Sequence, residues 1–111
     1  MEQIIKYQHI ITSLLEEYAS YKLATPGIES QVICDTLRHH YQLMRVGWDG
    51  NEYIHYIVFH FDIKDGKVWI QENRTDVDIA EALVERGIPK SDIVLGLQPP
   101  YLRVHTGYAA A

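Results

Sequence analysis

The fold is decided by residues 41–71, which read YQLMRVGWDGNEYIHYIVFHFDIKDGKVWIQ. Two turn signals divide this stretch, because Asp49-Gly50-Asn51 and Asp65-Gly66 supply the positive φ that tight hairpins need. The segments on either side of these turns are rich in β-branched and aromatic residues, which favour strands. We therefore predict three strands joined as an antiparallel meander. Their expected bounds are Tyr41–Trp48, Tyr53–Ile63 and Lys67–Gln71.

Two further elements are expected before this meander. Ile28–Asp35 shows the alternation of a strand, and it most simply adds to the edge of the meander. Upstream of Pro26-Gly27, which ends any helical continuation, apolar residues recur every three or four positions and predict an amphipathic helix. The residues of this apolar stripe are Ile4, Tyr7, Ile11, Leu14, Leu15 and Tyr18.

A second helix is expected after the meander. Thr75 is the predicted N-cap, with Asp78 three residues later in a variant of the capping box. Ile79, Ala80, Leu83 and Val84 would form its buried stripe. The helix should end before Gly87, since glycine favours the position after a helix and Pro89 blocks continuation.

The remaining C-terminal residues predict short pieces of structure. Ser91-Asp92 is expected to cap a short helical turn through Ile93–Leu95. Pro99-Pro100 forces an extended crossing, after which Tyr101–Val104 is expected to form a short edge strand. The tail Ala109-Ala110-Ala111 is expected to fray.

The predicted fold class is α+β, with an N-terminal helix, a four-stranded antiparallel meander sheet, a C-terminal helix and a short extended segment. At 111 residues, the chain is expected to form a single domain over residues 1–111. The helices should cover one face of the sheet and leave the other face partly solvated or available to a partner.

Composition argues against several classes of function. The formal net charge is −5, and the ten basic residues form no stripe, so strong direct binding to nucleic acid is not expected. The longest apolar runs, such as Ile57-Val58-Phe59, are far shorter than a membrane span. The single cysteine, Cys34, rules out an intrachain disulfide, and we expect a cytoplasmic protein.

The sequence predicts no metal site, no cofactor and no catalytic residues. His55 and His60 lie five positions apart on one strand and should project from opposite faces, and adjacent His39 and His40 diverge if extended. Structural zinc needs about four converging ligands, and no Cys-x-x-Cys or His-x-x-x-His pattern occurs. Cys34 lies within a predicted strand beside a carboxylate, which disfavours a reactive thiolate.

One polar set supports an alternative, enzymatic hypothesis. Asp62 ends one strand and Glu72-Asn73-Arg74 follows the next, an arrangement that resembles the Asp…Glu-x-Lys set of metal-dependent nucleases. Arg74 is a poor substitute for the lysine, because its guanidinium stays protonated and is bulkier than an ammonium. Converging carboxylates of Asp62 and Glu72 around one cavity would favour this alternative.

Several stretches together identify a family resemblance. The matching residues are Ile28–Gln31, Val46–Trp48, Lys67–Gln71, Ile79-Ala80, Leu83-Val84, Gly87–Gly96, Pro99-Pro100, Arg103 and His105–Ala109. The most specific stretch is Gly87–Gly96, GIPKSDIVLG. Taken together, they resemble the fdxN-element excision controlling factor family, the XisI-like proteins of nitrogen-fixing bacteria, over nearly the whole chain.

The resemblance implies a non-enzymatic role. Members of the family control the excision of a DNA element by a site-specific recombinase, alongside an accessory protein of the XisH type. We therefore expect a protein partner, either the XisH-type protein or the recombinase itself. The acidic charge agrees with a factor that acts through protein contacts.

The partner surface is predicted on the C-terminal segment. Arg103, His105, Thr106 and Tyr108 follow the Pro-Pro break, and arginine and tyrosine are enriched at binding hot spots. The competing interpretation is structural: Leu102 and Val104 would add an edge strand, with Arg103 facing water.

Overall fold

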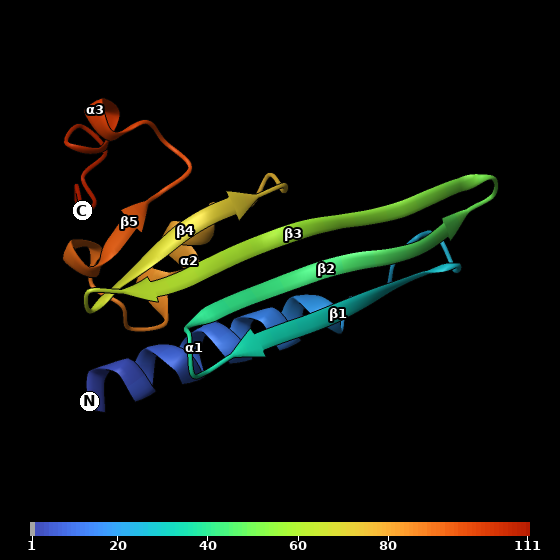
Figure 1. Ribbon diagram of the computed structural model, residues 1–111, viewed down its shortest axis with the longest axis horizontal. Coiled ribbons are helices and arrows are strands. Elements are labelled where there is room, and N and C mark those ends of the chain that lie inside the picture. Colours follow the sequence, from blue (N-terminus) through green and yellow to red (C-terminus); the bar gives the residue numbers. More distant parts are fainter. Residues whose placement is uncertain (1) are drawn as a thin grey trace.

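The computed structural model describes residues 2–111, which form one five-stranded sheet with the two longer helices on one side (Figure 1). The strands lie side by side in chain order. They are β1 (Ile28–Asp35), β2 (His40–Asp49), β3 (Glu52–Lys64), β4 (Lys67–Asn73) and β5 (Ile93–Leu95). The first four pair antiparallel, and β5 pairs parallel to β4. The sheet is therefore mixed and five-stranded, which corrects the predicted four-stranded antiparallel sheet.

The predicted turns connect the strands of the meander. Asp65 and Gly66 both have positive φ, 54° and 76°, as a type I′ turn requires. In the β2–β3 turn only Gly50, at 60°, has positive φ, which is the pattern of a type II′ turn. The two longest strands, β2 and β3, form a hairpin that, with β1 alongside it, extends well beyond β4 and β5 (Figure 1).

The core lies between the sheet and two helices. Helix α1 (Glu2–Ala19) buries the predicted residues Tyr7, Ile11, Leu14 and Leu15, and α2 (Ile79–Glu85) lies on the same side. The strand residues that meet them are Tyr41, Leu43, Phe59, Phe61, Ile63, Val68, Ile70 and Ile93. Burial of these apolar side chains is the main stabilising contribution to the fold.

An extra residue in β3 changes which side chains reach this core. The pairing passes from Met44 opposite Ile57 to Leu43 opposite Phe59, so Val58 is unmatched in β2 and forms a β-bulge. Val58 and Phe59 are consecutively buried, after which burial alternates through Phe61 and Ile63. The carbonyl of Val58 accepts a hydrogen bond from the Arg74 N–H at 2.9 Å. Because of the bulge, the alternation of inward and outward side chains in the second half of β3 is shifted by one residue relative to the first half.

The start of α2 differs from the predicted one. Asp78, not Thr75, is the N-cap, and its carboxylate accepts a hydrogen bond from the Glu81 N–H at 3.1 Å. Thr75 belongs to the preceding turn, where its N–H and its Oγ1 both donate to Asn73 Oδ1. The end of the helix is as predicted, because the N–H groups of Gly87 and Ile88 bond to the carbonyls of Val84 and Leu83 in a Schellman motif.

Three predictions for the C-terminal residues are wrong. The helical turn lies at Lys90–Asp92, as a 3₁₀ turn (η1), and Ile93–Leu95 is the parallel strand β5. Residues 100–103 form the short helix α3 (Pro100–Arg103) rather than an edge strand, because Pro100 occupies its first turn, where its missing N–H costs nothing. Ala109 is paired rather than frayed, since its N–H donates to the Ile93 carbonyl at 2.8 Å.

Candidate functional site

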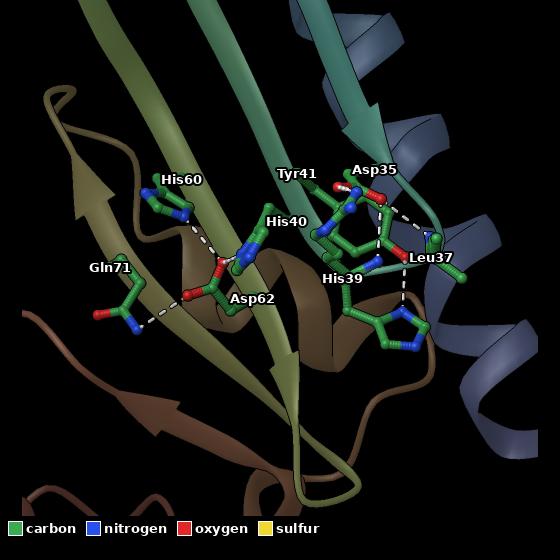
Figure 2. Close-up of polar contacts among 9 residues, drawn as sticks. Asp35, Leu37, His39, His40, Tyr41, His60, Asp62 and Gln71 are labelled. Atoms are coloured by element: carbon green, nitrogen blue, oxygen red, sulfur yellow. Dashed lines mark hydrogen bonds and ion pairs between the residues drawn. The ribbon is translucent and has the colours of Figure 1, made fainter.

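Three titratable side chains meet on the sheet face opposite α1 and α2. His40 begins β2, and His60 and Asp62 lie two residues apart on β3. Their neighbours Tyr41 and Phe61 point into the core, so side chains at these alternate positions project from the opposite face. Figure 2 shows Asp62 between the two imidazole rings, with Gln71 of β4 on its other side.

The Asp62 carboxylate holds this cluster together. Its Oδ1 lies 2.7 Å from His40 Nδ1 and 2.8 Å from His60 Nε2. Its Oδ2 accepts a hydrogen bond from Gln71 Nε2 at 3.2 Å. Both carboxylate oxygens are therefore in use, one shared by two imidazoles and the other fixed by an amide. We call His40, His60 and Asp62 the His-Asp-His cluster.

The charge of Asp62 is favoured by these contacts. Burial raises the pKa of its carboxyl group, but the hydrogen bonds from His40 and His60 lower it more, so that the net pKa lies below the usual range. Exposure of the side chain falls from 53% at His40 to 25% at His60 and 18% at Asp62. The cluster is thus open to solvent on one side and packed on the other.

The sequence did not reveal this cluster because it depends on pairing between strands. Spacing along one strand separates His55 from His60 and His39 from His40, and it carries no information about neighbours on the next strand. Counting back from the β2–β3 turn without a bulge would place His40 opposite Phe61. The bulge at Val58 shifts the register by one residue and places His40 opposite Asp62. The sequence does contain one sign of the bulge: in the long hairpin, the alternation of apolar residues shifts by one position near residue 58.

The two carboxylates of the nuclease hypothesis have different partners. Asp62 bonds to the histidines and Gln71, whereas Glu72 Oε1 accepts a hydrogen bond from Arg74 Nε at 3.2 Å. Glu72 lines a separate shallow depression with Met44, Tyr56 and Arg74. Asp62 therefore contributes to the His-Asp-His cluster, and Glu72 does not.

The C-terminal residues predicted to bind a partner differ in how the fold uses them. Arg103 donates to the carbonyls of Gln98 and Gly96, at 3.0 and 3.2 Å, and its guanidinium lies 5.2 Å from the centre of the Trp69 ring. Thr106 Oγ1 donates to the Arg103 carbonyl and accepts from the Tyr108 N–H. Tyr108 packs against the core, while His105 is exposed. Partner binding at these four residues stays a prediction.

Exposed apolar side chains surround this C-terminal segment. Tyr101 and Val104 are 74% and 65% exposed, and Leu97 and Leu102 are also exposed. Beneath them, Trp69 is only 9% exposed, because Arg103 and Lys64 cover its ring. Arg103 therefore holds the C-terminal segment against the sheet, and the exposed apolar side chains of that segment lie on its outer surface.

The structure also bears on membrane association. Among residues 2–111, no helix has the length and apolar character that a membrane crossing needs.

Comparisons with known proteins identify close relatives. The model of the XisI protein family matches residues 1–110. The crystal structure of a XisI-like protein from Anabaena variabilis is similar, with 52% sequence identity and a TM-score of 0.93 over 97% of this chain and 99% of that chain. That of the fdxN element excision controlling factor XisI from Anabaena variabilis has 31% identity and a TM-score of 0.84, over 98% and 99% of the two chains. A comparison with curated proteins finds no match.

Proposed function

Because the chain belongs to the XisI protein family, as its sequence motifs indicated, we propose that it is an accessory factor in the site-specific excision of a DNA element. One observation carries this proposal. A protein described as an fdxN element excision controlling factor shares the fold over 98% of this chain at 31% identity. This role belongs in the cytoplasm, the compartment that contains bacterial DNA.

The factor acts by binding a protein rather than by binding DNA directly. A protein that neutralises several phosphates needs clustered Lys and Arg, whereas this chain has 10 basic against 15 acidic residues. Three of its arginines form ion pairs with its own carboxylates: Arg38 with Asp35, Arg74 with Glu72 and Arg86 with Glu17. The proposed partner is an XisH-type accessory protein, with the recombinase as the alternative.

A non-enzymatic role fits the arrangement of the carboxylates. Metal-dependent nucleases need acidic groups that converge on one metal ion or on a close pair of ions. Here Glu72 is paired with Arg74 and lies outside the His-Asp-His cluster. The name of the relative, a controlling factor, also describes regulation rather than catalysis.

The partner surface is proposed on the C-terminal segment that contains Arg103, His105, Thr106 and Tyr108. Exposed Tyr101 and Val104 lie beside these residues and add apolar area to the same surface. Aromatic and arginine side chains in such a setting are typical of the centres of protein interfaces. In this arrangement Arg103 and Tyr108 position the segment, and His105 with its exposed neighbours contacts the partner.

An excision assay tests the proposed function. A reporter that carries the DNA element is introduced into a heterologous host with the recombinase and the XisH-type protein, and the rejoined junction is measured by quantitative PCR. We expect the junction to form only when this chain is also expressed. Equal junction formation without the chain would refute the accessory role.

A further inference from the structure

We propose that the His-Asp-His cluster binds one divalent transition-metal ion, with zinc as the ion that fits its ligands. The ligand atoms are His40 Nδ1, His60 Nε2 and Asp62 Oδ1, all within 4.8 Å of one another. This site goes beyond the proposed function and does not rest on it. It also reverses the expectation from sequence that no histidines converge.

The distances between the ligand atoms suit a small ion. Zinc binds imidazole nitrogen and carboxylate oxygen at 2.0–2.2 Å, so ligands at tetrahedral angles lie about 3.3 Å apart. The two nitrogens now lie 2.7 and 2.8 Å from Asp62 Oδ1, at hydrogen-bond distance. Replacing the shared protons by an ion requires these atoms to separate by roughly half an ångström, which side-chain rotation supplies.

The surroundings of the cluster favour ligation. Gln71 Nε2 donates to Asp62 Oδ2, which fixes the carboxylate and leaves Oδ1 directed at the histidines. Such a contact orients a metal-binding carboxylate, and its loss commonly weakens metal affinity. The imidazole rings of His40 and His60 are inclined at 80°, with their centres 6.4 Å apart, so they approach Asp62 from different sides. Both strands belong to the sheet and hold the three ligands in register.

The ligand set selects the class of ion. Magnesium and calcium prefer oxygen ligands, whereas two imidazoles and one carboxylate suit zinc and its neighbours in the transition series. Three protein ligands leave a fourth tetrahedral position for water. Because the His40 side chain is 53% exposed, the ion can enter from solvent on that side.

Calorimetry with zinc chloride tests the site. Full-length protein is treated with chelator, returned to metal-free buffer at neutral pH and titrated with zinc alone. We expect one ion per chain for the wild type and for the control His55→Gln, which changes an exposed histidine elsewhere on β3. Affinity should fall at least tenfold in Asp62→Asn and His60→Gln, and roughly 10- to 100-fold in Gln71→Met.

Cobalt provides a second readout that needs no variant. If the site is tetrahedral, Co²⁺ added to the wild type should give intense visible absorption, and one equivalent of zinc should abolish it. No zinc binding, or binding that Asp62→Asn and His60→Gln leave unchanged, would overturn the proposal. Loss of binding in His55→Gln alone would also overturn it, because the ion would then sit on a different surface histidine.

Discussion

His40 and Asp62 face each other across strands β2 and β3, with Nδ1 2.7 Å from Oδ1. This pairing exists because β3 carries one residue more than β2 between the pair and the hairpin turn, the bulge residue Val58. The same residue shift turns Phe59, Phe61 and Ile63 into the core. The bulge at Val58 thus determines which side chains of the second half of β3 pack in the core and which lie on the opposite face.

The contribution of Asp62 to stability can be measured directly. Asp62→Asn removes the charge that two imidazoles share and places an amide beside Gln71 Nε2. Since hydrogen bonds to charged groups contribute about 1.5–3 kcal/mol, we expect the free energy of unfolding in chelator to fall by roughly 1–3 kcal/mol. Urea denaturation followed by tryptophan fluorescence measures it. Asp65→Asn is the control, because Asp65 is exposed in a turn with φ 54° that asparagine tolerates; an equal loss there would contradict this role.

Tyr7 ties the N-terminal helix to the segment before β5. Its buried hydroxyl donates to Asp92 Oδ2 and accepts from Gln3 Nε2, and burial followed by the Asp92 bond raises the pKa of the tyrosine. Tyr7→Phe should destabilise the protein by about 1–2 kcal/mol, as expected for one hydrogen bond to a carboxylate. The matched control is Tyr21→Phe, which removes a hydroxyl that bonds Glu17 on the exposed surface and should therefore change stability much less. Equal melting temperatures for the two variants would contradict the expected difference.

Cys34 should behave as an unactivated thiol. Partial burial of the sulfur raises the pKa of the Cys34 thiol, a contact of Thr12 Oγ1 with Sγ at 3.9 Å opposes this, and the charge of Glu16 adds to the increase. A raised pKa means less thiolate at a given pH, so alkylation should be slower than for a cysteine peptide. The pH at which the alkylation rate is half-maximal should also lie above the value of about 8.5 expected for a cysteine peptide.

Iodoacetamide rates across a pH series check this prediction. Glu16→Gln removes one cause of the increase and should move the midpoint downward. A wild-type midpoint below that of the peptide would instead identify an activated cysteine.

Elements governed by local chemistry were predictable from sequence. Helix α1 follows from its apolar periodicity, and the β3–β4 turn follows from Asp65-Gly66, since both residues adopt the positive φ that the turn type demands. The edge position of β1 beside β2 was also as predicted. Each of these depends on residues close together in the chain.

Elements decided by distant contacts were not predictable in the same way. Strand β5 has only three residues and is stabilised by parallel pairing with Val68–Ile70 and by burial of Ile93 and Val94. Short apolar segments of this kind do not distinguish strand from helix. The His-Asp-His cluster required the exact register of two long strands, and one bulge changes that register.

Variants of the C-terminal segment can distinguish a structural role of its residues from a role in partner recognition. Arg103→Ala should lower the free energy of unfolding by about 1–2 kcal/mol, because the carbonyls of Gln98 and Gly96 lose their donor. His105→Ala, at an exposed position, should leave stability within about 0.5 kcal/mol. If the segment contacts the partner, Tyr101→Ala combined with His105→Ala should weaken binding by at least about 2 kcal/mol without unfolding the protein. A folded double variant that binds the XisH-type protein at full strength would move the partner surface elsewhere.

The proposed function requires a complex between this chain and a protein partner. Co-expression with the XisH-type protein from the same genome, followed by size-exclusion chromatography with light scattering in about 0.15 M salt, tests it most directly, since exposed charges are largely screened there. We expect a single species that contains both proteins and whose mass exceeds that of either protein alone. Two separate peaks at the masses of the individual proteins would contradict it.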